Sequence, residues 1–416
     1  MTSTQKDDKT ESKTGKTLPA EDGITSAIIN LLKKSLAEKQ VEAIMIPSKV
    51  PDTEAYTWLL LQDESLLALG NPLPPVMTVQ GGKALSNVTK HGDLQEKVAA
   101  VMRPCEVQAA VELLKLKQID LDHIYLISVD CPGAMPLRDY VNDPEKTAKA
   151  FEEAFSTWGE NESVRPVCQI CHQFSLPAPQ QSASSDNSLP KTEANFPAAD
   201  LHIGLIGGDG KNVFLIPATT KGQDLLDNLD LSAEDSMANW ESKVEEIRER
   251  KLNKRKAADA EWQAKTEGVD NLTAVFDDCI NCHNCQSACP VCYCQQCYFD
   301  SQLLRLSPES YLERAEKRGA LRFPLDTLLF HVGRMSHMAL SCVSCGACED
   351  ACPMSIPVGQ VFTMMGNKTQ EYFAYSPGTD RNEPLPLQIF EEDEFGEVET
   401  PREGAEAPKE EAEKNV

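Results

Sequence analysis

Apolar residues recur along the first part of the chain in two alternating patterns. One has helical spacing, with members three or four positions apart: Ile24, Ile28, Leu31, Leu32 and Leu36. The other consists of short continuous runs at 41–48, 97–102 and 123–131, which predict buried strands. The segment EVQAAVELLKLKQ, between the last two runs, predicts another helix. Strands that alternate with helices predict an α/β (α+β) domain with an at least partly parallel sheet, which binds ligands at the carboxyl ends of its strands.

Two segments refine the limits of this domain, which we place at 19–232. The Ser-, Pro- and Gln-rich stretch 175–197 predicts a flexible surface insertion, because a strand pattern resumes directly after it. The glycines that follow, at 204, 207, 208 and 210, resemble a dinucleotide-binding fingerprint. That motif must open a helix, whereas KNVFLIP predicts a strand, so GGDGK is interpreted as a hairpin turn and a Rossmann fold is rejected.

The second half of the chain has a helical pattern. Residues 233–268 are charged, with Glu and Lys or Arg often three or four apart, and predict a helical linker on the surface. A smaller, mostly helical domain is expected at 269–366, with a helical insertion at 298–341. One helix of that insertion should bury an apolar face made of Leu325, Leu328, Leu329, Val332 and Met335. His331 and His337 on the same helix are interpreted as structural residues.

The two ends and the overall charge exclude several classes of partner. Residues 1–18 and the acidic segment 385–416 are predicted to be disordered tails. A net charge of −25 argues against nucleic acid and anionic membranes. No apolar run approaches the roughly 20 residues of a membrane span, and no signal peptide is recognised. We therefore expect a soluble, cytoplasmic protein whose fifteen cysteines are reduced and sensitive to oxygen.

The chemistry of the chain is concentrated in two cysteine runs. Each run contains CxxCxxCxxxCP, in which three cysteines of one loop and the fourth of the other loop hold a [4Fe-4S] cluster. This spacing predicts one cluster on Cys279, Cys282, Cys285 and Cys352, and a second on Cys342, Cys345, Cys348 and Cys289. Zinc is the rival interpretation, since CxxC pairs also bind Zn²⁺, but each run by itself offers four cysteines followed by proline. The runs thus predict electron transfer.

A second group of four cysteines lies in the α/β domain. Cys105 and Cys131 each follow a predicted strand, and Cys168 and Cys171 form a CxxC pair. Together they offer one further cluster site at the strand ends. The alternative, that Cys105 and Cys131 are ordinary buried residues and the CxxC pair binds something else, stays open on spacing alone.

Three cysteines remain after three clusters are assigned: Cys292, Cys294 and Cys297. They could join another donor, such as Cys289 or His283, in a fourth cluster. We favour reduced thiols packed near the first run, because a complete fourth cluster is one cysteine short.

The motifs RPCE, DCPG, the CxxC pair and the two runs together resemble the beta-subunit family of coenzyme F420-reducing hydrogenase and formate dehydrogenase. The most similar members are the longer formate dehydrogenase beta subunits, in which an F420-hydrogenase-beta-like domain precedes a two-cluster ferredoxin-like domain. The resemblance covers about Gly23 to Val361, and MRPCEVQAAVELLKLKQ and RMSHMALSCVSCGACEDACP are its most specific parts.

The resemblance implies FAD in the α/β domain, with Cys105, Cys131, Cys168 and Cys171 as ligands of a third [4Fe-4S] cluster. It further implies that FAD exchanges a hydride with coenzyme F420, while the clusters pass single electrons to a partner subunit, of formate dehydrogenase or heterodisulfide reductase type, in a hetero-oligomer. A subunit that uses NAD(P)H or ferredoxin in place of F420 is one alternative. An iron–sulfur adaptor that lacks flavin is another. The chain carries no sign of a formate-oxidising site, which must lie on another chain.

Five residues are candidates for contacts with the flavin. Gly23, Thr25 and Ser26 open the first helix, where free N–H groups favour a pyrophosphate. Asp22, an acid where the family has glycine, weakens this site and keeps the adaptor alternative open, and Thr25 is alternatively a helix cap. Arg103 and Lys83 are candidates for binding phosphate or stabilising reduced flavin; for each, a surface ion pair is the alternative.

Overall fold

The fold is described from a computed structural model of the full chain. It describes residues 15–92, 94–176, 198–227, 238–304, 306–321, 324 and 326–389. Most of the predicted insertion at 175–197 therefore lies outside the described residues, as do nearly all of both predicted tails. Residues up to Asn382 form one compact unit, and a second begins at Glu383, of which a 3₁₀ turn at Pro386–Gln388 is described.

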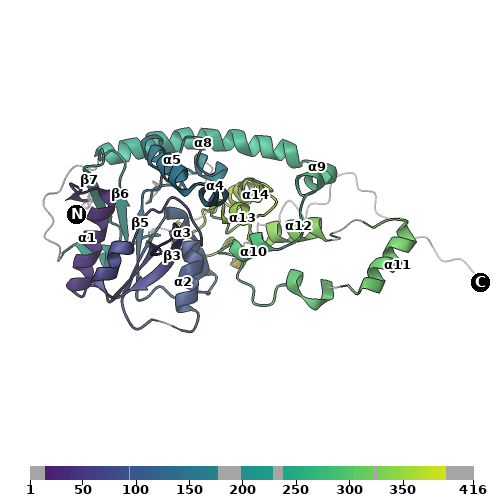
Figure 1. Ribbon diagram of the computed structural model, residues 1–416, viewed down its shortest axis with the longest axis horizontal. Helices are drawn as coiled ribbons and strands as arrows, with labels where there is room; N and C mark the ends of the chain where they lie inside the picture. The colour runs from purple at the N-terminus through teal and green to yellow at the C-terminus, as the bar shows by residue number, and fades with distance from the viewer. Residues whose placement is uncertain are drawn as a thin grey trace, which may run out of the picture. The chain divides into compact units, whose positions relative to one another are not determined.

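A seven-stranded mixed sheet is the centre of the first unit (Figure 1). Its strand order is β1-β7-β6-β5-β4-β2-β3, in which β2, β4, β5 and β6 are parallel and β1, β3 and β7 pair antiparallel with their neighbours. The strands are β1 Lys16–Pro19, β2 Ala43–Lys49, β3 Tyr56–Leu61, β4 Val98–Met102, β5 Ile124–Val129, β6 Leu201–Gly204 and β7 Asn212–Pro217. The predicted hairpin between β6 and β7 and the α/β fold class are confirmed.

Helices cover this sheet and lead into the second half of the chain. Those of the sheet region are α1 Ile24–Ala37, α2 Gly81–Thr89, α3 Pro104–Lys115, α4 Leu137–Asn142, α5 Pro144–Thr157, α6 Pro166–Gln169 and α7 Thr220–Asp227, with a 3₁₀ helix at Glu64–Leu69. Central strands such as β4 and β5 are buried along their whole length, because helices pack on both faces of the sheet. Continuously apolar runs therefore identified them correctly.

The sequence interpretation of the N-terminal part was wrong in two places. Residues 16–18, assigned to a disordered tail, belong to β1, which pairs with β7 from Lys16↔Leu215 to Pro19↔Asn212. The pairing explains this, because an edge strand obtains its backbone partners from the sheet and needs little apolar pattern of its own. The sequence pattern also predicted no helix at Gly81–Thr89, which forms α2 and begins where the Gln80 side chain accepts a hydrogen bond from the Lys83 N–H.

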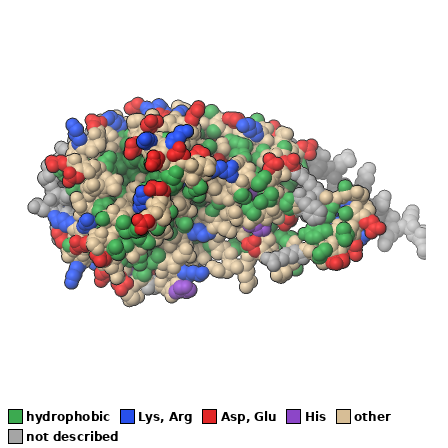
Figure 2. Space-filling view, in the orientation of Figure 1, with side chains coloured by type: hydrophobic (Ala, Val, Ile, Leu, Met, Phe, Trp, Pro, Cys, Tyr) green, Lys and Arg blue, Asp and Glu red, His purple; other side chains and the backbone are tan. Residues whose placement is uncertain are grey.

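Helix α8, Ala238–Thr266, runs from the β6–β7 hairpin to α9, Gly268–Val275 (Figure 1). It contacts the hairpin through Asn239, whose amide donates to the Gly207 carbonyl, and it contacts α14 through Asp259, which accepts from Asn367. Figure 2 shows acidic and basic side chains mixed along its outer surface. The prediction of a helix is confirmed, but the helix is not a mere surface linker, since Arg248, Lys251 and Arg255 are buried beneath it.

The rest of the first unit is mostly helical, as predicted. Its helices are α10 Asn284–Ala288, α11 Pro308–Arg318, α12 Thr327–Met338, α13 Ala347–Asp350 and α14 Val358–Tyr372, with 3₁₀ turns at Tyr298–Asp300 and Gln302–Leu304. Among the described residues, no helix is both long and apolar enough to cross a membrane.

The predicted buried face of α12 was right for Met335 but wrong for two other residues. Leu329 and Val332 are exposed, whereas the buried face consists of Phe330, His331, Arg334, Met335 and Met338. The side chain of Leu325 lies outside the description. The reason is chemical: His331 and Arg334 are turned inward because their ring and guanidinium contact cysteines of the first run. A prediction based on apolar spacing alone cannot include such residues.

Candidate functional site

The four cysteines of the α/β domain lie together beyond the carboxyl ends of β4 and β5. Cys105 is in the first turn of α3, directly after β4, and Cys131 is two residues after β5. Burial, together with the neighbouring thiols of Cys131 and Cys171, raises the pKa of the Cys168 thiol to about 11, although the positive charge of Arg165 opposes that shift. Burial likewise raises the pKa of Cys105, with contributions from Cys345, Cys131 and Cys171. Each thiol therefore lies within electrostatic range of others in the group.

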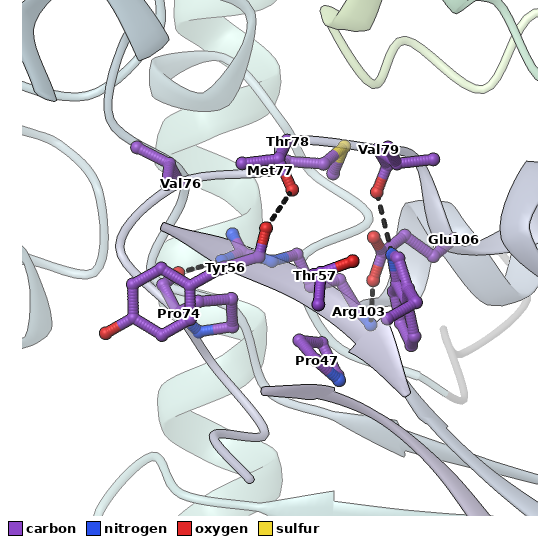
Figure 3. A pocket seen from close by; sticks show the side chains of 11 residues that line it. Pro47, Tyr56, Thr57, Pro74, Val76, Met77, Thr78, Val79, Arg103 and Glu106 are labelled. Carbon is purple, nitrogen blue, oxygen red and sulfur yellow. Dashed lines mark hydrogen bonds between the residues drawn. The ribbon is translucent and has the colours of Figure 1, made fainter. Parts of the chain in front are cut away.

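A cavity that is partly open to solvent lies beside this cysteine group, and Figure 3 shows the side chains that line it. It lies where β2 and β4 end and β3 begins. Its lining residues are Pro47, Tyr56, Thr57, Trp58, Pro74, Val76, Met77, Thr78, Val79, Arg103 and Glu106. Hydrogen bonds from Trp58 Nε1 to the Val79 carbonyl (2.9 Å) and from Thr78 Oγ1 to the Tyr56 carbonyl (2.9 Å) fix the loop 74–79 against β3.

Two buried charged residues form the inner wall of the cavity. The Arg103 guanidinium donates to the carbonyls of Pro74 and Gly133, and its Nη1 lies 3.6 Å from the sulfur of Cys131. The Glu106 carboxylate accepts from the N–H groups of Arg103 (2.8 Å) and Gly81 (3.0 Å). Burial raises the pKa of Glu106, although the positive charge of Arg103 opposes that shift. Arg103 thus contacts both the cavity and the cysteine group.

Of the five residues predicted to contact a flavin, only Arg103 lines the cavity. It is 2% exposed, so the alternative of a surface ion pair was wrong for this residue. Gly23 is the N-cap of α1 and has no side-chain cap, while Thr25 and Ser26 lie in the first turn; none of the three lines the cavity. The Lys83 ammonium donates to the Ser287 carbonyl, and so joins α2 to the first cysteine run.

Basic side chains of α8 cover the CxxC loop. The Lys251 Nζ donates to the Cys168 carbonyl (3.2 Å), and Arg248 Nε donates to the His172 carbonyl (3.2 Å). The Arg255 Nη1 lies 2.6 Å from Nδ1 of His172. Burial lowers the pKa of His172 well below its ordinary value, so its ring is neutral and accepts this hydrogen bond. Burial also lowers the pKa of Lys251, and the thiols of Cys171 and Cys168 oppose that shift.

The residue before Cys131 anchors the end of β5. The fully buried Asp130 carboxylate accepts from Trp240 Nε1 (2.9 Å) and from the N–H groups of Leu205 (2.8 Å) and Ile206 (3.2 Å), and it lies 2.8 Å from Nε2 of His202. Burial alone would raise the pKa of Asp130, but His202 and the hydrogen bonds lower it below the ordinary value. The position of Cys131 is therefore held by a carboxylate that ties β5 to β6 and α8.

The two cysteine runs are brought together by the fold. Burial, together with the thiols of Cys279, Cys352 and Cys282, raises the pKa of Cys285 to about 11, although the positive charge of Arg334 opposes that shift. These four line a second cavity, which is partly open to solvent. In the same way, burial raises the pKa of Cys348, with contributions from Cys289, Cys345 and Cys342. The last cysteine of each run thus lies among the first three of the other, which is the arrangement that crossed cluster ligation requires.

One buried arginine lies between the two sets of four. The Arg334 Nη1 is 2.9 Å from the sulfur of Cys285, and Nη2 donates to the Cys285 carbonyl (3.1 Å). Its guanidinium packs over the rings of Phe330 and Phe362, 5.5 and 4.8 Å from their centroids. On the same helix, His331 Nε2 is 3.4 Å from the sulfur of Cys279, and its ring stacks on Phe276.

The second run also adjoins the cysteines of the α/β domain. The Arg165 guanidinium donates to the carbonyls of Cys345 (3.1 Å) and Met77 (3.2 Å) and forms an ion pair with Asp350. Met77 lines the first cavity, and Cys345 raises the pKa of Cys105. The cavity, the four cysteines and the second run therefore form a continuous series.

The three additional cysteines lie close to one another after the first run. Burial raises the pKa of Cys292, and the thiols of Cys297 and Cys294 add to it. Cys294 is exposed, and all fifteen cysteines are free of disulfides. Among the described residues, no three His, Cys, Asp or Glu side chains converge as ligands of a single metal ion do. That finding concerns mononuclear sites, because a four-iron cluster holds its thiolates farther apart.

Comparison with known proteins finds relatives that cover most of the chain. The chain is 28% identical over 393 residues to the F420-dependent formate dehydrogenase 1 subunit beta of Methanococcus maripaludis, which covers 87% of this chain and 92% of that protein. It is 26% identical over 311 residues to the F420-dependent formate dehydrogenase subunit beta of Methanocaldococcus jannaschii, covering 70% of this chain and 76% of the relative. This chain is a relative of the F420-dependent formate dehydrogenase beta subunits. The resemblance noted in the sequence is confirmed.

Two further comparisons each cover only part of this chain. Residues 275–356, which contain both cysteine runs, match the 4Fe-4S dicluster domain family. The F420-reducing [NiFe] hydrogenase complex from Methanosarcina barkeri has a chain that aligns with a TM-score of 0.43 at 12% identity, covering 62% of this chain and 93% of the other. That score is too low to establish a shared fold.

Several residues of the site were missed in the sequence. Glu106 had a usable signal, since a glutamate at the third position of a helix commonly accepts from the N-cap N–H, as it does here from Arg103. Trp58 lies in β3, a strand that the sequence pattern did not predict. Lys251 and Arg255 had no local signal, because they are part of a uniformly charged segment whose burial depends on the distant CxxC loop.

Proposed function

We propose that the chain is the flavin-carrying electron-transfer subunit of an F420-linked oxidoreductase complex. The observation that carries this proposal is the position of Arg103, which lines the first cavity and also contacts the sulfur of Cys131. A flavin ring in the cavity would lie next to a cluster on Cys105, Cys131, Cys168 and Cys171. The role of formate dehydrogenase beta subunit is supported by the two relatives, which cover most of both chains.

The donor set suits this assignment. The thiols of Cys168 and Cys171 are buried with raised pKa values, so they are neutral as free thiols, and iron would deprotonate them on binding. The two cysteine runs would hold the other two clusters. Cys289 and Cys352 would each bind the cluster of the opposite run. Flavin supplies conversion between hydride and single-electron transfer. The chain's own residues would place it: Trp58 and Tyr56 as aromatic walls, Arg103 as a cation, and Glu106 as a buried acid.

The order of the sites suggests the route of the electrons. Because Arg165 joins Met77 of the cavity to Cys345, the cluster on Cys342, Cys345, Cys348 and Cys289 would be second in the series. The cluster on Cys279, Cys282, Cys285 and Cys352 would be last. Its Cys282 is exposed, which suits exchange with a partner subunit such as the formate-oxidising chain.

A cavity-filling substitution tests the proposal. Thr57→Trp, on β3, should fill the cavity and lower the FAD released by acid at least tenfold while leaving the iron content unchanged. Leu60→Trp is the matched control, since Leu60 is 47% exposed on the same strand and does not line the cavity. Native protein should also be reduced rapidly by F420H₂ under argon in stopped-flow measurements.

Three results would contradict parts of this assignment. Native protein with three clusters but without flavin would identify an iron–sulfur adaptor. Rapid bleaching by NADH, without a reaction with F420H₂, would replace the hydride carrier. Normal flavin content in Thr57→Trp would move the flavin to another site.

A further inference from the structure

Three basic residues of α8 lie on one buried face of that helix. Arg248, Lys251 and Arg255 are three and four positions apart, a spacing that places side chains on the same side. They are 3%, 0% and 9% exposed, respectively. Burial of three cations on a helix with an otherwise charged sequence indicates a specific need for positive charge under α8.

The three residues differ in how their charge is balanced. Arg248 forms an ion pair with Glu245 (2.9 Å). Lys251 has no carboxylate within ion-pair distance among the described residues; its Nζ lies 4.9 Å from the centroid of Phe174 and donates to the Cys168 carbonyl. Glu160, whose charge also reaches Lys251, pairs instead with the exposed side chains of Arg250 and Lys254.

The positive charge of Arg255 is balanced only in part. Its Nη1 contacts the neutral ring of His172, and Asp259, one turn further along α8, contributes a favourable negative charge. An uncompensated cation in a protein interior is costly unless an anion accompanies it. The thiols within electrostatic reach of Lys251 are those of Cys171, Cys168 and Cys131, all in the cysteine group of the α/β domain. Those within reach of Arg255 are Cys171 of the same group and Cys342 of the second run.

We propose that Lys251 and Arg255 are buried counter-cations of the cluster on Cys105, Cys131, Cys168 and Cys171 and raise its reduction potential. This inference rests on the proposed function, because the anion is the cluster with its four thiolates. The cluster accepts one electron, no bond or proton is exchanged, and its net negative charge grows by one. A cation that stays fixed nearby stabilises the reduced form more than the oxidised form, since Coulomb attraction is strong in a low-dielectric interior.

The consequence is functional rather than only structural. A higher potential at this cluster would make it a better acceptor for electrons that leave the flavin. Lys251 and Arg255 are thus positioning residues for electron transfer: they do not touch the reacting atoms, but they set the energy of the first acceptor.

The test is a redox titration of the full-length, anaerobically reconstituted protein, monitored by electron paramagnetic resonance. Cys168→Ser identifies the signal of this cluster, because that signal should be lost while the two others remain. Lys251→Met should then reduce the equilibrium constant for its reduction at least tenfold, which is about 59 mV for a one-electron couple. Lys251→Arg should stay near the native value, and Arg255→Met should shift in the same direction as Lys251→Met.

Lys254→Met is the matched control. Lys254 lies three positions after Lys251 on α8 and its side chain is exposed, so the substitution removes the same charge and should leave the potential unchanged. Equal potentials in Lys251→Met and Lys254→Met, with the cluster retained, would overturn the inference. If Lys251→Met does not retain the cluster, Arg255→Met decides in its place, and an unshifted potential there overturns it. A native protein without a third signal would instead refute the proposed function itself.

Discussion

Asp130 is fully buried one residue before Cys131, and the donors that surround its carboxylate come from three different elements. The Trp240 indole belongs to α8, the His202 ring to β6, and the N–H groups of Leu205 and Ile206 to the turn after β6. A single side chain therefore determines how the strand end that carries Cys131 meets the helix that carries Lys251. Asp130 therefore affects the site indirectly, by holding Cys131 in position.

Substitution of Asp130 should show this. Asp130→Asn keeps the shape but leaves buried donors without an ionised acceptor, so we expect a loss of about 3–5 kcal/mol in the free energy of unfolding. Thermal unfolding of the anaerobic protein, followed by circular dichroism at a fixed scan rate, measures it as a lower melting temperature. Asp122→Asn, on the exposed loop before β5, should have little effect. Equal melting temperatures for the two variants would contradict this role.

At the level of residues, the sequence predicted the cysteine positions better than their surroundings. Cys105 and Cys131 were placed correctly at strand ends, because buried strands are recognisable as apolar runs. Arg165 was not foreseen, since its partners Cys345, Met77 and Asp350 are distant in the chain. Contacts between residues far apart in sequence leave no periodic pattern.

Two short elements connect the cysteine group of the α/β domain with the second cysteine run: α6, which carries Cys168, and the turn before α13. Gly346 in that turn has a φ of 73°, and a β-carbon there would lie 2.6 Å from Cγ2 of Val167 in α6. This close approach depends on glycine, which adopts the left-handed conformation and has no side chain. The distance between the two groups is thus set by packing of one glycine on one valine.

Gly346→Ala should therefore weaken the connection. We expect a loss of stability of about 1–2 kcal/mol from the backbone conformation, with a further loss from the clash. Reduction by F420H₂ of the two clusters proposed for the cysteine runs should also become slower in stopped-flow traces. Gly268→Ala is the control, because Gly268 has a similar φ of 82° and open space around it. Val167→Ala in the same chain should restore part of the loss; absence of both the slowing and the rescue would refute the packing argument.

At the level of elements, apolar periodicity predicted the sheet and the main helices, but not which face of α12 is buried. His331 and Arg334 face inward because Cys279 and Cys285 provide partners. Leu329 and Val332 face outward. A polar residue is buried when a specific partner exists, and the partner was not visible in the sequence of the helix.

Across the whole chain, the described cysteines form three sets of four and one set of three. Anaerobically reconstituted protein should therefore contain about 12 iron atoms per chain, measured by colorimetric or mass-spectrometric assay. A triple Cys292→Ser, Cys294→Ser, Cys297→Ser variant should keep that value. A reproducible native content near 16, lowered by the triple substitution, would show that the three cysteines help to hold a fourth cluster.

The proposed last cluster also suggests where a partner subunit binds. Ile280 is 56% exposed, Met354 is 42% exposed, and both line the second cavity beside the exposed Cys282. Exposed apolar side chains around a redox site are typical of interaction surfaces.

Ile280→Glu should reduce the amount of partner that co-purifies with the tagged chain at least tenfold, with the iron content unchanged, because it places a charge in an apolar contact. Leu312→Glu, on α11 and 70% exposed, is the matched control. If both variants retain the partner equally, the partner binds elsewhere.

The course of α8 also has a consequence for biogenesis. Residues 168–172 are made early, yet the side chains that cover them, Arg248, Lys251 and Arg255, emerge from the ribosome later. Until α8 docks, the CxxC loop is open to solvent and to the machinery that delivers iron and sulfide. Docking of the helix would then close the loop over the proposed cluster, so we expect insertion of that cluster to precede docking of α8.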